Sequence, residues 1–343
     1  MSKIKLVIHI GLPKTGTSFI QSTLLRFKSE LSNYGILYPS AGLHGSGHAG
    51  FGTGFVERKM KSVLADSNIF NTENDPYRVR DDILYEVACA SRKVEKVLLS
   101  SESFTLADPV NIKRLHALFA PYFSVNIVVF LRRQDIYAES SRAQAYRVNE
   151  SGFNPLRLLD EQNRHLNFEE ILHNWETVFG QQNIRVIEYP ENGSLQPQIY
   201  KAFGLPTKLT FGEQNVNVKL GRDLLEFIHF YTRLRYGTEE YFRVLSELEL
   251  VEAQNPTDGR YTYFYSPEQR QKLVNLCTGM NKKIGTRYGM RLFASLDPNV
   301  DTDSWQPYPG LPQEKREKFE LVLKKEAPDL LISDAPIDRG YLA

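Results

Sequence analysis

The sequence predicts an α/β fold, built on a central parallel sheet of about five strands with helices on both faces. Short β-rich runs alternate with helical patterns through the first 190 residues of the 343-residue chain. Several of these runs are continuously apolar, which is typical of strands that are covered on both faces of a parallel sheet. Strand–helix alternation of this kind places helices on both sides of the sheet.

Five segments have the pattern of strands. The first, residues 5–10, ends at Gly11, and the second, residues 35–38, is stopped by Pro39. The third, fourth and fifth strands are predicted over residues 96–100, 125–131 and 184–189.

Helices between the strands are indicated by apolar spacing and by capping residues. One apolar stripe directly follows the first strand and consists of Ile20, Leu24, Phe27 and Leu31. A later helix begins at Asn167, which forms a capping-box pattern with Glu170, and it ends at Gly180.

Beyond residue 190 the pattern becomes mostly helical. One stripe consists of Leu224, Ile228, Tyr231 and Leu234. Another helix opens at Ser266, with Pro267 at its first position and Gln269 at its third. We expect one α/β domain over residues 1–296, including a helical cap at about 200–296. A loop, a polar helix and a tail are expected over residues 297–343.

Charge and cysteine content exclude several classes of protein. Lysine and arginine total 42 against 41 aspartate and glutamate residues, which leaves a net charge of +1. A chain so balanced has no overall attraction for nucleic acid or for an anionic membrane, so any bound anion needs a local site. The only cysteines, Cys89 and Cys277, encode neither a disulfide framework nor a zinc cluster.

No segment has the pattern of a membrane span or a secretion leader. The longest apolar runs, such as residues 127–131, are far below the ~18 residues that a bilayer requires. The apolar stretch at residues 6–10 is also too short for the core of a leader peptide. We therefore expect a cytoplasmic protein.

The most informative stretch is a glycine-framed loop between the first strand and the first helix. Gly11 and Gly16 bracket Leu12-Pro13-Lys14-Thr15, and Thr17-Ser18 open the helix. This order points backbone N–H groups and the positive end of the helix dipole at one place, which favours an anion. A nucleotide-kinase P-loop would carry lysine at position 17, whereas here the lysine is Lys14. The sequence therefore predicts an anion site on a fold of the P-loop type.

The loop resembles the 5′-phosphosulfate loop of sulfotransferases that use 3′-phosphoadenosine 5′-phosphosulfate (PAPS). The residues that carry this resemblance are Pro13, Lys14, Thr15, Gly16, Thr17 and Ser18. In that family the loop lysine and the hydroxyl residues after it hold the 5′-phosphate and the sulfuryl group. The resemblance implies the same cofactor-binding role for these six residues.

A second stretch is similar to the 3′-phosphate motif of the same family. There an arginine at a strand end and a serine eight residues later bind the 3′-phosphate, and Arg132 and Ser140 have this spacing. A guanidinium fork matches the oxygens of a phosphate, and a hydroxyl adds a neutral donor. Arg133 and Ser141 have the same spacing, so the alternative register stays open. Weaker similarity extends the resemblance over roughly residues 4–290.

The resemblance implies an enzyme that moves a sulfuryl group from PAPS to a hydroxyl acceptor by in-line displacement. The co-product would be adenosine 3′,5′-bisphosphate, and the acceptor implied by bacterial members is a saccharide or glycolipid. Lys14 and the loop N–H groups would neutralise charge on the leaving 5′-phosphate. No metal is expected, because the protein itself supplies the cations. Candidates for acceptor contacts follow Ser140 along its helix and are Arg142, Gln144, Tyr146 and Arg147.

A hydroxyl acceptor also calls for a general base, and two candidates are open. Glu102 follows the third predicted strand and should emerge at the same edge of the sheet as Lys14 and Arg132. His48 lies in a glycine-rich loop after the second strand, and an imidazole can act near neutral pH without a large pKa shift. Topology favours Glu102. His9, inside the first strand, is predicted to be a core histidine.

Two other functions are alternatives to sulfuryl transfer. A P-loop kinase using Mg·ATP would share the strand–loop–helix geometry, although the position of Lys14 and the Arg132–Ser140 spacing argue against it. A nucleotide-binding module without catalysis would keep both phosphate motifs and lack a working base.

Overall fold

The computed structural model describes residues 3–56, 75–149, 166–191, 193–209, 211, 220–293 and 305–332. The chain forms two compact units. The first comprises Met1–Arg133, Arg164–Val216 and Thr278–Leu296, and the second comprises Gln134–Asn163, Asn217–Cys277 and Asp297–Ala343. The predicted boundary between residues 296 and 297 lies outside the described residues, and the predicted division into domains stays a prediction.

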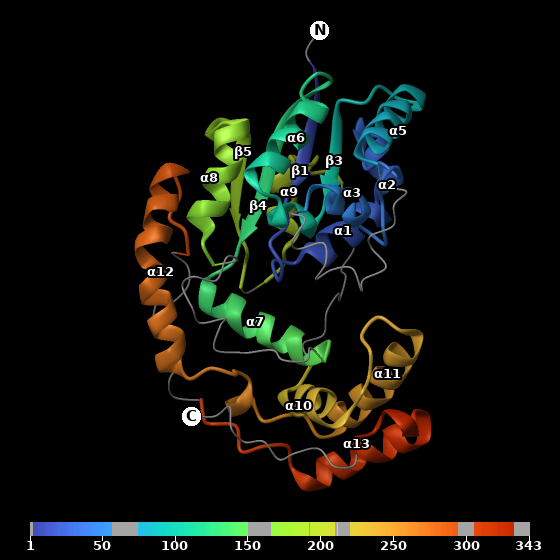
Figure 1. Ribbon diagram of the computed structural model, residues 1–343, viewed down its shortest axis with the longest axis vertical. Coiled ribbons are helices and arrows are strands. Elements are labelled where there is room, and N and C mark those ends of the chain that lie inside the picture. Colours follow the sequence, from blue (N-terminus) through green and yellow to red (C-terminus); the bar gives the residue numbers. More distant parts are fainter. Residues whose placement is uncertain are drawn as a thin grey trace. The chain divides into compact units, whose positions relative to one another are not determined.

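The first unit contains a five-stranded sheet in the order β2-β3-β1-β4-β5 (Figure 1). The strands are β1 (Ile4–His9), β2 (Ile36–Leu37), β3 (Lys96–Ser100), β4 (Phe123–Leu131) and β5 (Ile184–Glu188). All the strand pairs are parallel, so the predicted α/β class with a parallel sheet is confirmed. β1 lies in the middle, between β3 and β4.

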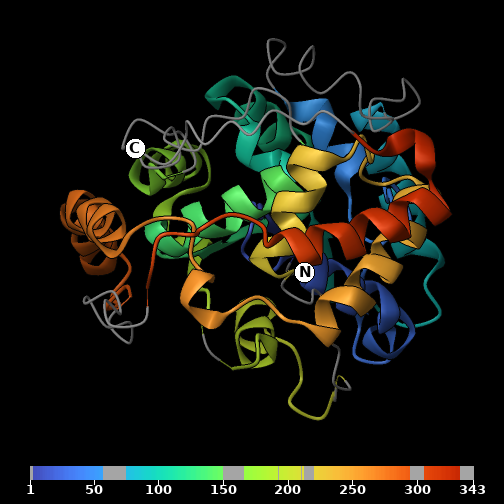
Figure 2. The same cartoon turned by 90° about the horizontal axis from the view of Figure 1, so that it is seen from below.

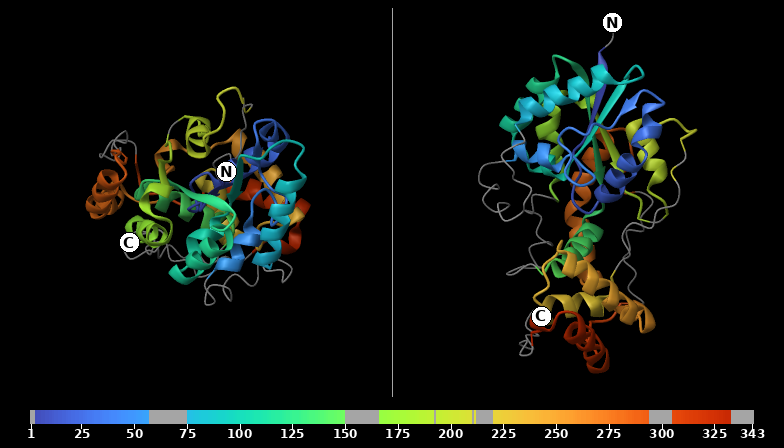
Figure 3. Two further views of the ribbon diagram at one scale, coloured as in Figure 1. Left: turned by 90° about the horizontal axis from the view of Figure 1, so that it is seen from above. Right: turned by 90° about the vertical axis from the view of Figure 1, so that its right-hand side faces the viewer.

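Helices cover both faces of this sheet, as predicted (Figure 3). On one face lie α3 (Ala49–Gly52), α5 (Pro76–Cys89), α6 (Pro109–Phe119) and α8 (Phe168–Phe179). On the other face lie α1 (Thr17–Arg26), α2 (Lys28–Ser32) and α9 (Gln196–Phe203). Alternate residues of each strand point to opposite faces, so every central strand contributes to two separate cores. In β1, Leu6 and Ile8 are buried in one core and Val7 in the other.

The predicted capping residues close the helix ends where they were expected. The Asn167 side chain accepts a hydrogen bond from the Glu170 N–H at 3.1 Å, and Gly180 ends α8 with a positive φ of 79°. At the start of α12 (Pro267–Arg287), the Gln269 N–H donates to Ser266 Oγ at 3.2 Å. The Ser266 N–H donates in return to Gln269 Oε1 at 2.9 Å, which completes a capping box.

The second unit is helical. Its helices are α7 (Gln134–Arg147), α10 (Arg222–Tyr231), α11 (Glu239–Gln254), α13 (Gln313–Glu326) and the first part of α12 (Figure 2). A buried lysine, Lys315 of α13, forms ion pairs with Asp223 of α10 at 2.8 Å and with Glu252 of α11 at 2.7 Å. Because both carboxylates meet one ammonium group, this cluster holds the three helices together. The polar helix predicted within residues 297–343 is α13.

Candidate functional site

The site lies at the carboxyl edge of the sheet in the first unit. The glycine-framed loop leaves β1, Glu102 follows β3, and Arg132 follows β4. Because β3 and β4 are the two neighbours of β1, these three segments emerge side by side. Chain order reverses direction at β1, and open α/β sheets bind ligands at such a switch point.

The loop after β1 has a left-handed backbone at two positions. Lys14 has φ 62° and Gly16 has φ 75°, and Gly16 is the residue before α1. The Thr15 hydroxyl donates to the Leu12 carbonyl at 2.6 Å, which closes the loop on itself. No side chain caps the start of α1. The first N–H groups of the ten-residue helix are therefore available to an anion, and the helix dipole favours one there.

A substitution at Gly16 tests how tightly this loop is packed. An added Cβ would lie 2.6 Å from Leu195 Cδ2 and 3.0 Å from Tyr189 Cε2, at a φ that disfavours any side chain. We expect Gly16→Ala to lower the free energy of unfolding by about 2–3 kcal/mol, measured by urea denaturation. Gly45→Ala is the matched control, because Gly45 has φ 63° but no atom within 4 Å of an added Cβ. In the control, the free energy of unfolding should fall only by the cost of the left-handed backbone conformation, about 1 kcal/mol. Equal losses in the two variants would contradict tight packing at Gly16.

Glu102 lies beside the loop. It begins a short 3₁₀ helix, Glu102–Leu106, directly after β3, and Ser101 caps that helix through the Ser103 N–H at 3.1 Å. The protein around the carboxyl raises its pKa by desolvation, although the side chain keeps solvent-exposed surface. A hydrogen bond from the Thr17 hydroxyl and the charge of Lys14 both oppose this rise in pKa. Lys14 and Glu102, two of the three residues predicted from the sequence to be catalytic, thus interact with one another.

Arg132 also contacts the loop. Its Nη1 donates to the Lys14 carbonyl at 3.0 Å, so the end of β4 supports the residue with the left-handed backbone. Its Nε and Nη2 donate to the two carboxylate oxygens of Glu191 at 3.1 and 3.2 Å. The guanidinium also lies 4.8 Å from the centre of the Tyr189 ring. The predicted arginine is therefore next to the predicted loop, already paired with a carboxylate.

His48 does not have the geometry of a base. It is completely buried, the Ser100 N–H donates to its Nδ1 at 3.2 Å, and its Nε2 is 3.2 Å from the Pro39 carbonyl. Nδ1 thus holds a lone pair and Nε2 the proton, which leaves neither nitrogen for a substrate. Burial lowers the pKa of His48 to about 4. His48 fits a structural role, and Glu102 is the candidate base that the geometry favours.

His9, in β1, contacts the carboxyl end of β3 from within the sheet. It is completely buried, and burial lowers its pKa to about 3. Its Nδ1 lies 2.8 Å from Ser100 Oγ, to which Gln21 of α1 also donates at 3.2 Å. His9 and His48 therefore bind the residue two positions before Glu102 from two sides. This agrees with the core role predicted for His9.

Ser140, the predicted partner of Arg132, lies on α7 in the second unit, so their pairing stays a prediction. Between the two registers, exposure distinguishes the arginines. Arg133 is buried, whereas Arg132 is half-buried and therefore within reach of a dissolved phosphate. The geometry favours the register of Arg132. Arg142, a predicted acceptor contact, is buried with its guanidinium 4.9 Å from the Phe264 ring centre, which is typical of a packing role.

Sequence reasoning missed two residues of the site, Tyr189 and Glu191, which both follow β5. The Tyr189 ring lies against Arg132, and a Cβ on Gly16 would meet that ring, so Tyr189 fills the space between the two predicted motifs. The rule that pointed to Glu102, that polar residues at the carboxyl end of a parallel strand reach the site, applies equally to Glu191.

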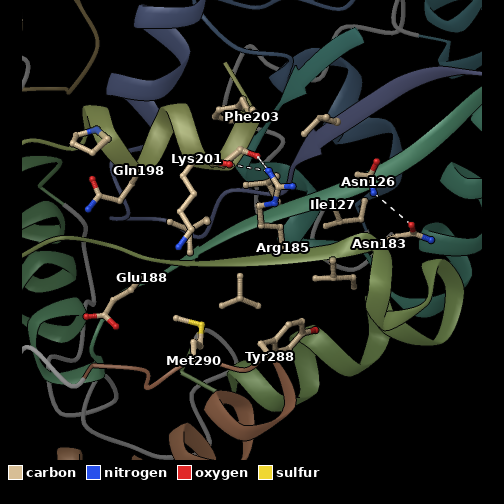
Figure 4. A pocket seen from close by; sticks show the side chains of 18 of the residues that line it. Asn126, Ile127, Asn183, Arg185, Glu188, Gln198, Lys201, Phe203, Tyr288 and Met290 are labelled. Carbon is tan, nitrogen blue, oxygen red and sulfur yellow. Dashed lines mark hydrogen bonds between the residues drawn. The ribbon is translucent and has the colours of Figure 1, made fainter. Parts of the chain in front are cut away.

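A cavity of about 1280 Å³ lies along β5 (Figure 4), and Glu191, the partner of Arg132, is among the residues that line it. Two of the cations that line it, Lys96 and Arg185, are engaged with the end of α9, where carbonyl groups lack helical partners. Lys96 donates to the Phe203 and Gly204 carbonyls at 2.7 and 2.8 Å, and Arg185 donates to the Lys201 and Ala202 carbonyls at 2.8 and 2.9 Å. No residue of the glycine-framed loop lines this cavity, so the predicted anion site lies outside it.

In the described part of the chain, no group of three or more His, Cys, Asp or Glu residues is placed to hold a metal ion. None of the described helices is both long and apolar enough to cross a membrane.

Neither a protein-family model nor a curated protein matches the chain. Similar solved structures include a sulfotransferase from Alicyclobacillus acidocaldarius, at 14% identity and a TM-score of 0.40, covering 75% of this chain and 98% of that one. A second is the sulfotransferase domain from the curacin biosynthetic pathway, at 14% identity and a TM-score of 0.34, covering 61% of this chain and 76% of that domain.

Proposed function

We propose that this chain is a sulfotransferase that moves a sulfuryl group from PAPS to a hydroxyl of a saccharide or glycolipid. The observation that supports this most directly is the meeting of three segments at the carboxyl edge of the sheet. An uncapped, glycine-framed loop with Lys14, a carboxylate with a raised pKa at Glu102, and a partly buried arginine at Arg132 lie next to one another.

The residues of the loop fit a phosphate or phosphosulfate group. The start of α1 offers N–H donors that no side chain caps, and Lys14 adds a positive charge. A guanidinium has five N–H donors, and Arg132 uses two of them with Glu191 and one with the Lys14 carbonyl. Two donors are left for a phosphate. The loop would hold the 5′ end of PAPS, and Arg132, together with Ser140, its 3′-phosphate.

PAPS supplies the activated sulfuryl group, and the chain supplies position, charge and a base. Glu102 would take the proton of the acceptor hydroxyl as its oxygen bonds to sulfur. The bond between sulfur and the 5′-phosphate oxygen breaks in the same step, and the electron pair leaves with the bisphosphate. Lys14 and the first N–H groups of α1 would stabilise the charge that grows on this oxygen. The raised pKa of Glu102 suits the role, because it makes the carboxylate a stronger base than an ordinary one.

Binding and transfer assays on the full chain test the proposal. We expect calorimetry to give a dissociation constant for adenosine 3′,5′-bisphosphate at least ~10-fold below that for Mg·ATP, a difference of about 1.4 kcal/mol. We also expect sulfate transfer from PAPS to at least one member of a saccharide and glycolipid panel.

Two outcomes would contradict the proposal in different ways. Tight binding of Mg·ATP alone would indicate a P-loop kinase. Binding of the bisphosphate without transfer to any acceptor of the panel would instead indicate a nucleotide-binding module without catalysis.

A further inference from the structure

The ion pair between Arg132 and Glu191 is the least expected feature of the site. Both side chains are largely buried, at 17% and 11% exposure, and the carboxylate meets the guanidinium side-on through two hydrogen bonds of 3.1 and 3.2 Å. Bidentate pairs of this kind are stronger than single-contact surface pairs. Arg132 thus carries a resident anion at the place where the proposed function requires a phosphate.

The geometry leaves room for a second anion. A guanidinium has five N–H donors, of which the Glu191 carboxylate takes two and the Lys14 carbonyl takes one. A phosphate can therefore bind to Arg132 while Glu191 stays in place. It then binds to an arginine whose charge is already offset by a carboxylate at hydrogen-bond distance, and the two anions repel one another.

The 3′-phosphate has no part in bond making. It is present in the substrate and in the product alike, so strong binding of it lowers the energy of both equally and does not speed the chemical step. Strong binding does slow release of the bisphosphate product, and product release limits turnover in many enzymes. A residue that weakens this contact would raise turnover.

We propose, on the basis of the proposed function, that Glu191 sets the strength of phosphate binding at Arg132 and thereby speeds release of the bisphosphate product. Glu191 does not touch the reacting atoms in this role. It acts through Arg132 and is a positioning residue.

Glu191→Gln isolates the charge, because the amide oxygen still accepts a hydrogen bond from Arg132. We expect this variant to bind adenosine 3′,5′-bisphosphate about 10-fold more tightly than the wild-type chain by calorimetry. Affinity for adenosine 5′-phosphate, which lacks the 3′-phosphate, should change less than twofold. Single-turnover sulfate transfer should keep its rate, whereas steady-state kcat should fall. If Glu191 had only a structural role, the substitution would change the affinities for both nucleotides by a similar factor. It would also change the single-turnover rate and the steady-state kcat by a similar factor.

Arg132→Gln supplies the reference background. In that background, Glu191→Gln should leave bisphosphate affinity unchanged, because the arginine through which the charge acts is gone. Unchanged or weaker bisphosphate binding in the single variant Glu191→Gln would overturn the inference, even if the wild-type chain transfers sulfate.

Failure of the proposed function would look different. If the wild-type chain bound no adenosine nucleotide and transferred no sulfate, inorganic phosphate would be the probe for Arg132. Tighter binding of inorganic phosphate to Glu191→Gln than to the wild-type chain would support the role of Glu191, and equal binding would overturn it.

Discussion

Replacing Lys14 with alanine is expected to lower kcat about 10²- to 10³-fold, while the dissociation constant of the bisphosphate product rises less than 10-fold. Charge on the leaving 5′-phosphate is greatest in the transition state, so a lysine that meets it there contributes more to rate than to binding. Alanine and lysine meet similar backbone strain at the φ of 62°, so the fold should persist. Initial rates with PAPS and calorimetry with the bisphosphate give the two quantities.

Lys113→Ala is the control for this substitution. Lys113 is an exposed lysine of α6, on a part of the first unit that contributes nothing to the loop, and its loss should change neither quantity. If Lys14→Ala lowered product affinity by the same factor as kcat, Lys14 would be a binding residue without a special part in the chemical step.

The loss of Lys14 should also change the pH dependence of the activity that remains. The Lys14 charge lowers the pKa of Glu102 against the rise caused by desolvation. Without that charge the pKa of the carboxyl rises further, so the acidic limb of the rate profile should move to higher pH in Lys14→Ala.

The fold was predictable because its strands are buried on both faces. The middle of β3, residues 97–99, must be apolar throughout when helices cover both sides of it, so the strand is visible in the sequence without any periodicity. Helices α5 and α6 were not predicted, although each begins with an aspartate cap followed by proline, at Asp75-Pro76 and Asp108-Pro109. These two caps are sequence signals that apolar spacing alone does not use.

The site was predictable only up to the order of the strands. Strand endings showed that Lys14, Glu102 and Arg132 would reach one edge of the sheet, but not that β3 and β4 both lie beside β1. The burial of His48 depends on its contacts with Ser100 and Pro39, which are distant along the chain. The pairing of Arg132 with Glu191 spans 59 residues and has no local pattern.

Replacing Glu102 with glutamine is expected to lower kcat about 10²- to 10⁴-fold and to remove the acidic limb of the rate profile. The base must be ionised, so activity is present above the pKa of Glu102 and is lost as the pH falls through it. Because desolvation raises this pKa, the limb in the wild-type enzyme should lie at higher pH than for an ordinary carboxyl group. Rates from pH 4 to 9 at saturating PAPS are the measurement, and Glu95→Gln, at an exposed carboxylate just before β3, is the control.

Stability separates a functional role of Glu102 from a structural one. A carboxyl whose pKa is raised by folding makes the folded state less stable when it is ionised, because the unfolded chain holds the charge more easily. At pH values above its raised pKa, Glu102→Gln should therefore unfold at the same or a higher urea concentration than the wild-type chain. A residue that held the fold together would show the opposite. A large loss of stability, or an acidic limb that survives in Glu102→Gln, would exclude Glu102 as the base. Loss of kcat with stability retained would mean that this chain keeps an unfavourable charge beside its loop because the chemistry requires it.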